Sequence, residues 1–272
     1  MKRFGLSVIG VAAAAGVTVA ALAAEHRQGY LAPGEFDVTH VLEPAPRPGD
    51  PRYTTDRKIF RATRQLKDTP RWQMATNDAD TSVAALMRDY SCAVGVELTP
   101  GNAPALAKVV SRAGADTGHE TGMAKAYYKR ERPFVIDNGP ICQPASELFD
   151  EKAGRMSYDY PSGHTTWGWT WALILTALAP DRAQQILERG RAYGDSRFIC
   201  GAHNESAVEG GLQSASATMA LVETKPAYQV DLAAAKAELD HLRAGGAPKP
   251  QGCAAEANLI AQRVMPKLGK GE

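Results

Sequence analysis

The segment Gly163–Ala179, with the sequence GHTTWGWTWALILTALA, decides the fold class of this 272-residue chain. It carries no acidic or basic residue apart from His164 near its start, and Pro180 follows its last residue. Its three tryptophans are two residues apart, so they cannot share one face of a helix. A helix that is apolar all round is either the buried centre of a domain or a membrane span. With only about 17 residues it is just short for a span, so we predict a buried central helix.

Further helices are predicted on both sides of this segment, because apolar residues recur there at three- and four-residue spacing. The predicted ranges are Lys58–Leu66, Arg71–Leu86, Asn102–Ala113, Thr117–Tyr128, Arg182–Tyr193, Ala207–Val222 and Asp231–Ala244. Strand signals are few and no internal repeat is present. The sequence therefore predicts an all-α fold, a compact single-domain helical bundle that covers residues 56–245.

The two ends of the chain are expected to lie outside this bundle. Lys2 and Arg3 precede an uncharged, alanine-rich run that ends in small residues at Ala24, a pattern typical of a cleaved secretory signal peptide over residues 1–24. An uncleaved membrane anchor is the alternative. Residues 25–55 are rich in proline and are predicted to be extended, and residues 246–272 are predicted to form a C-terminal tail.

Charge and cysteine content narrow the class of protein. The net charge of +1 gives no overall attraction to nucleic acid or to an anionic membrane. The four cysteines are Cys92, Cys142, Cys200 and Cys253. After export they can form two disulfides in three alternative pairings, between which the sequence does not choose. No pair has the CxxC spacing of a zinc site.

One segment, Tyr160–His164, predicts an anion site at the start of the central helix. The first amides of a helix have no partner inside it and point toward an incoming anion. Gly163 lets a ligand approach the backbone closely, and Ser162 can cap the helix or donate its hydroxyl. His164 would lie at the rim of this site, where it can donate a proton.

Two other segments supply cations and a second histidine. Lys125 and Arg132 are seven residues apart, about two helical turns, so we expect them to project toward one point. Arg197 can add a third cation. Such a cradle suits a transferring phosphoryl group, which His203 could attack while His164 protonates the leaving oxygen. Because side chains supply the positive charge, this chemistry requires no metal or other cofactor.

Each of these residues has an ordinary structural explanation when it is taken alone. Lys125 and Arg132 would be surface charges, Ser162 a helix cap, and Arg197 an ion-pair partner. His203 would be a buried polar residue. It is the combination, in this order and at this spacing, that indicates a site.

The combination resembles the signature of the phosphatidic acid phosphatase type 2 superfamily. That signature has Lys and Arg-Pro separated by six residues, then Pro-Ser-Gly-His, then Ser-Arg and His separated by five residues. The chain matches each of these positions from Lys125 to His203. The contexts Arg71–Gln73 and Cys200–His203 also resemble the class A bacterial non-specific acid phosphatases, and the resemblance extends over roughly residues 29–242.

The resemblance implies a function and a role for each matched residue. His203 would be the nucleophile and His164 the general acid. The phosphate group would be bound by Lys125, Arg132, Ser162, Gly163 and Arg197. Members of this family are all-α, periplasmic and often homo-oligomeric, and they hydrolyse small phosphomonoesters; some also transfer phosphate to alcohols. The implied partner is thus a small-molecule phosphomonoester, with no nucleic acid and no membrane bound by the mature form.

Ala207 departs from the family pattern. The signature places an aspartate four residues after the nucleophile, where it would orient the imidazole ring and stabilise its positive charge. If another group replaces it, Glu209 is the carboxylate that we expect to do so. The alternatives are a weak or specialised enzyme, a phosphate- or phosphoester-binding protein derived from the family, or a substitution introduced by design.

Two further functions share the same anion cradle. A vanadium-dependent haloperoxidase would be a much longer chain, and the sequence around the motifs favours a phosphatase. A membrane lipid phosphatase of the superfamily would need several spanning helices, which the sequence after residue 24 does not contain.

Overall fold

A computed structural model of the chain describes residues 28–267, so the predicted signal peptide lies outside the described residues. The α-helices are α2 (Pro51–Thr63), α3 (Pro70–Asn77), α4 (Val83–Val94), α5 (Pro104–Tyr128), α6 (Pro133–Asp137), α7 (Gly163–Leu178), α8 (Ala183–Cys200), α9 (Glu205–Val222), α10 (Pro226–His241) and α11 (Cys253–Ile260). Two short antiparallel strands, β1 (Phe149–Asp150) and β2 (Arg155–Met156), form a hairpin. The all-α prediction is confirmed.

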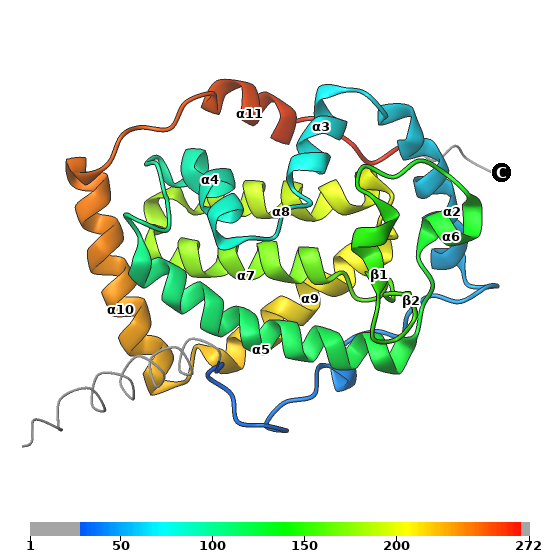
Figure 1. Ribbon diagram of the computed structural model, residues 1–272, viewed down its shortest axis with the longest axis horizontal. Coiled ribbons are helices and arrows are strands. Elements are labelled where there is room, and N and C mark those ends of the chain that lie inside the picture. Colours follow the sequence, from blue (N-terminus) through cyan, green and yellow to red (C-terminus); the bar gives the residue numbers. More distant parts are fainter. Residues whose placement is uncertain (1–27, 268–272) are drawn as a thin grey trace, which may run out of the picture.

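Helix α7 is the predicted central helix. It contacts α5, α8 and α9 along its length, and Figure 1 shows it running through the middle of the molecule beside α8. Trp171, Ile174 and Leu175 are completely buried within the main hydrophobic cluster. Burial of side chains this large supplies the main driving force for folding, at roughly 1.5–3 kcal/mol for each large apolar side chain.

Glycines bring α7 and α8 into close contact. A Cβ atom at Gly168 would lie 2.3 Å from the ring of Tyr193, and one at Gly190 would lie 2.6 Å from the Cβ of Ala172. Both distances are shorter than any van der Waals contact, so the two helix backbones can approach this closely only with glycine at these positions. The close packing fixes the end of α8 relative to the start of α7.

Several of the predicted helix boundaries are wrong, and two of these errors change the number of helices. The range Arg71–Leu86 contains two helices, because the side chain of Asp80 accepts a bond from the Ser82 amide and Ser82 then caps α4. Asn102–Ala113 and Thr117–Tyr128 are instead parts of the single helix α5. Its Gly114 lies against the ring of Trp167 and does not interrupt the helix.

The N-terminal segment lies over the bundle without forming an α-helix within residues 28–50, as the prolines predict. It is attached to α5: the amides of Tyr30 and Leu31 donate to Asp116, and the amide of Val38 donates to Glu120. The range predicted as the C-terminal tail, residues 246–272, contains α11.

The structure resolves the cysteine pairing that the sequence left open. Cys92 is bonded to Cys253 with a Cα–Cα distance of 5.3 Å, and Cys142 to Cys200 with a distance of 4.7 Å. The first bridge attaches α11 to α4, and the second attaches the loop after α6 to the end of α8. Within residues 28–267 no helix is both long and apolar enough to cross a membrane.

Candidate active site

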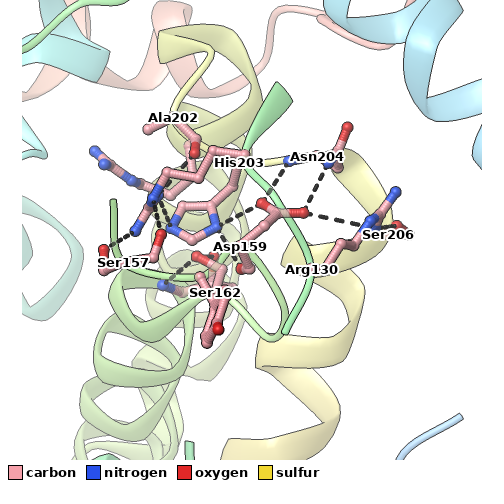
Figure 2. A network of polar contacts seen from close by, with 12 residues as sticks. Arg130, Ser157, Asp159, Ser162, Ala202, His203, Asn204 and Ser206 are labelled. Carbon is pink, nitrogen blue, oxygen red and sulfur yellow. Dashed lines mark hydrogen bonds and ion pairs between the residues drawn. The ribbon is translucent and has the colours of Figure 1, made fainter. Parts of the chain in front are cut away.

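The predicted site residues meet at the start of α7, beside the turn that links α8 to α9. His203 lies in that turn and is only 1% exposed. Its Nδ1 lies 2.7 Å from the carbonyl oxygen of Asp159 and 3.0 Å from the Oδ1 of the same residue. Figure 2 shows His203 and Asp159 facing each other. A carbonyl oxygen can only accept a hydrogen bond, so Nδ1 carries the ring proton. Nε2 is therefore unprotonated and carries the electron pair.

Arg132 donates to that electron pair, with its Nη1 3.0 Å from the Nε2 of His203. Its other bonds hold it rigidly: Nε and Nη2 donate to Ser157, and Nη1 donates to the Ala202 carbonyl. These contacts come from the segment after the β-hairpin and from the turn that carries His203 (Figure 2). The guanidinium is thus fixed next to the atom that the family pattern makes the nucleophile.

Lys125 and Arg132 do converge, but the predicted geometry is wrong. Helix α5 ends at Tyr128, Lys129 has a left-handed φ of 51°, and Arg132 precedes the first residue of α6. A turn of the chain, and not two turns of one helix, brings the two cations together. The ammonium of Lys125 donates to the carbonyl of Tyr158, next to Asp159.

Arg197 supplies the clearest sign of an anion site. Its guanidinium is completely buried, and Nη2 donates to the side-chain oxygen of Gln143. Nε and Nη1 have no hydrogen-bond partner within the part of the chain that the structure describes. A buried charged donor without a partner is costly, so these two groups point to the place of an anion.

Ser162 and Gly163 form the start of α7, as predicted. The hydroxyl oxygen of Ser162 caps the helix by accepting from the amide and the hydroxyl of Thr165, at 3.3 and 2.9 Å. The proton of the Ser162 hydroxyl remains available for a ligand. Gly163 lies against the Lys125 side chain, since a Cβ atom there would be 3.8 Å from the Cε of Lys125.

His164 is half-buried next to this helix start. Its Nε2 lies 3.1 Å from the carbonyl oxygen of Ala79, so Nε2 carries a proton and Nδ1 is the nitrogen left for proton transfer. A cavity of about 530 Å³ between α5 and α7 has Gly163, His164 and Trp167 along one wall. A departing group therefore has room beside His164.

Burial and positive charge lower the pKa values of both histidines. The pKa of His203 lies well below its usual range, chiefly because of burial and then because of Arg132, Lys125 and Arg197. The pKa of His164 is lowered by burial, by Arg197 and by His203. Burial lowers the pKa values of Arg132 and Arg197 to about 10, which leaves both charged at neutral pH. A bound anion would oppose these effects on the histidines.

The expectation that Glu209 orients His203 is wrong. The Glu209 carboxylate is half-exposed and pairs with Arg52, whereas the carboxylate in contact with His203 is that of Asp159. Sequence reasoning missed Asp159, although an acidic residue directly before the Tyr160–His164 motif was a visible signal. Ala207 itself is completely buried. No group of three or more histidine, cysteine or acidic side chains within residues 28–267 is arranged to hold a metal ion.

Comparison with known proteins gives a consistent result. A family model described as the PAP2 superfamily matches residues 104–228. The chain is 42% identical over 202 residues to an acid phosphatase of Zymomonas mobilis, covering 74% of this chain and 75% of the relative. It is 37% identical over 247 residues to a non-specific acid phosphatase of Salmonella typhimurium, with 90% and 92% covered. A non-specific acid phosphatase of Providencia stuartii is 33% identical over 209 residues, with 76% and 83% covered.

Proposed function

This chain belongs to the PAP2 superfamily and is a phosphoric monoester hydrolase of the acid phosphatase type, and we propose that it acts through a phosphohistidine on His203. The observation that carries the proposal is the pairing of two features. The Nε2 of His203 is unprotonated and accepts from the Nη1 of Arg132, and the buried Nε and Nη1 of Arg197 lack partners in the described residues.

In the proposed first step, the electron pair of Nε2 attacks phosphorus and a P–N bond forms. The bond from phosphorus to the ester oxygen breaks, and that oxygen takes a proton from the Nδ1 of His164. Lys125, Arg132 and Arg197 bind the oxygens of the phosphoryl group together with the hydroxyl of Ser162 and the first amides of α7. These groups are fixed before substrate arrives, so they stabilise the transition-state charge without reorganising.

In the proposed second step, a water molecule attacks phosphorus and gives its proton to the Nδ1 of His164. The P–N bond breaks, its electron pair returns to the Nε2 of His203, and phosphate leaves. An alcohol in place of water would give phosphate transfer, so we extend the proposal to phosphotransferase activity. The same nitrogen of His164 serves as acid and then as base, as microscopic reversibility requires.

The pKa shifts account for action at acid pH. His203 must be neutral to attack, and burial together with the neighbouring cations lowers its pKa, which favours the neutral ring. His164 must be protonated, and the bound phosphoryl anion raises its pKa toward that state. As the pH rises, the protonated fraction of His164 falls, so activity decreases toward alkaline pH.

We also propose that the mature enzyme is periplasmic, that residues 1–24 are its signal peptide, and that it assembles with further copies of itself. The pattern of the first residues and the two disulfides support export. The domain limits given above, residues 56–245 for the catalytic bundle, remain part of this proposal.

The test is phosphate release from a chromogenic aryl phosphate, from acid to neutral pH, with a chelator present. The mature protein should turn over, and His203→Ala should lose this activity. The exposed His119 provides a matched control, and His119→Ala should keep it. Rapid quenching in alkali followed by mass spectrometry should find one phosphoryl group on His203. Full turnover by His203→Ala, or a phosphoryl group on another residue, would contradict the proposal.

A further inference from the structure

We propose that Asp159 is the positioning carboxylate of His203. It lies in the segment before α7, and it orients the imidazole ring as the family pattern expects of an aspartate at the position of Ala207. The proposal rests on the function proposed above, because it concerns the nitrogen that attacks phosphorus. Asp159 belongs to none of the three signature segments that the sequence singled out.

The carboxylate of Asp159 is completely buried and is contacted by hydrogen-bond donors (Figure 2). Its Oδ1 lies 3.0 Å from the Nδ1 of His203 and 3.1 Å from the amide nitrogen of Asn204. Its Oδ2 lies 2.7 Å from the Nδ2 of Asn204 and 3.6 Å from the Nη1 of Arg130. A carboxylate anion requires such an environment, since it can accept hydrogen bonds but cannot donate them.

An outer layer of polar groups fixes this arrangement. Arg130 donates to Asp56 at 2.6 Å and to the hydroxyl of Ser206 at 2.7 Å. The amide of Ser206 donates to the other oxygen of Asp56 at 3.0 Å. Arg130 is thus held from the far side, and Asp159 is held between Arg130 and His203. Supporting groups of this kind keep a site within the narrow range of geometry that catalysis needs.

Ala207 is placed where a carboxylate would have unfavourable surroundings. Its side chain belongs to a buried apolar cluster that includes Val38, Leu42 and Ala124. His203 precedes the first residue of α9, so the two positions do not face each other along one helix. A charged group at position 207 would be costly in this cluster. It would also have to share with Asp159 the single proton on Nδ1.

The chemical role of Asp159 follows from these contacts. Together with the carbonyl oxygen of the same residue, which lies 2.7 Å from Nδ1, it keeps the ring proton on Nδ1, so that the electron pair stays on Nε2. It also stabilises the positive charge that the ring acquires while the phosphoryl group is attached. In the serine-protease triad, the corresponding Asp→Asn change lowers turnover by ~10⁴-fold, because the wrong tautomer results.

The experiment compares three single variants of the mature protein with the unmodified enzyme. Asp159→Asn should lower kcat for an aryl phosphate by ~10–10²-fold, less than the triad value, because the charge beside the imidazolium is lost while the carbonyl of residue 159 still accepts from Nδ1. Inhibition by inorganic phosphate should change only a few-fold, because the cations that bind phosphate remain. Asp231→Asn is the matched control, a buried carboxylate that pairs with Arg112 outside this network, and its kcat should stay within a few-fold of the unmodified enzyme. Ala207→Asp should leave kcat unchanged or lower it.

A pH profile separates positioning from a purely structural role. Removing the Asp159 charge disfavours the imidazolium form of His203, so the acid limb of kcat/KM should move to lower pH in Asp159→Asn. A loss of folded protein alone would scale the whole profile without moving the limb.

Two results would overturn the inference. One is an Asp159→Asn enzyme that turns over within a few-fold of the unmodified protein. The other is a clear gain in kcat from Ala207→Asp, which would mean that Nδ1 lacks an effective partner; this result is decisive even if Asp159→Asn does not fold. If both the unmodified protein and Ala207→Asp are inactive, the proposed function itself fails and the inference falls with it.

Discussion

Arg197 shows how a single side chain can indicate a ligand. Its buried Nε and Nη1 lack partners in the described residues, while Nη2 donates to Gln143.

Arg197→Lys keeps the charge but loses the planar set of donors. Each lost charge-assisted hydrogen bond is worth about 1.5–3 kcal/mol, so we expect inorganic phosphate to inhibit ~10–100-fold more weakly. The measurement is the inhibition constant for phosphate, with the exposed Arg61→Lys as control. Equal inhibition of both variants would mean that Arg197 does not contact the anion.

A second prediction concerns the charge of Lys125. This ammonium is one of the causes that lower the pKa of His203. In Lys125→Gln one cation is lost, so the pKa of His203 rises and the ring becomes protonated at a higher pH. The acid limb of kcat/KM should therefore move to higher pH, the opposite direction from Asp159→Asn. An acid limb that stays in place would show that Lys125 lies electrostatically remote from the nucleophile, and one that moves to lower pH would contradict the sign of this effect.

At the scale of elements, the two disulfides differ in what they hold. Cys142–Cys200 fixes the loop that carries Gln143 against the end of α8, three residues before His203. Cys92–Cys253 attaches α11, which has no buried residue. Both bridges restrict the unfolded chain, so removing either should lower stability, by roughly 2–5 kcal/mol.

The activities of the two disulfide variants should differ. Cys142→Ser with Cys200→Ser frees Gln143 from Arg197, so KM should rise several-fold. Cys92→Ser with Cys253→Ser should lower the melting temperature and leave KM unchanged. The measurement is KM together with thermal unfolding for each double variant. An equal effect of both pairs on KM would mean that the loop with Gln143 does not position Arg197.

At the scale of the whole molecule, the contact between α7 and α8 depends on glycine. Gly190→Ala places a methyl group 2.6 Å from the Cβ of Ala172, and such overpacking costs about 1–3 kcal/mol. Gly118 is a matched control on α5, because a Cβ atom there meets nothing within 4 Å. Gly118→Ala should instead stabilise the protein by about 0.5–1 kcal/mol. Urea unfolding followed by tryptophan fluorescence measures both changes, and a Gly190→Ala protein as stable as the unmodified one would contradict the packing described.

The sequence predicts those parts of the molecule that depend on local pattern. The apolar run from Gly163 predicts the central helix, and motif spacing finds His203, His164 and the three cations. The sequence does not predict the turn that brings Arg132 to Lys125, since this turn depends on the left-handed backbone conformation at Lys129. The sequence does not predict the role of Asp159 for a related reason, because its contact with His203 joins segments 44 positions apart. Distances of this kind are set by the packing of α7 against α8 and α9.

The contact between Asp159 and His203 has a consequence for the evolutionary record of the superfamily. A search that requires an aspartate four positions after the second histidine would classify this chain among degenerate members. If the carboxylate has moved, the two alignment columns should covary. Relatives that lack an acidic residue at the position of Ala207 should carry one immediately before their Tyr-Pro-Ser-Gly-His motif. Relatives that have an acidic residue at the position of Ala207 should be free to lose the one at the position of Asp159.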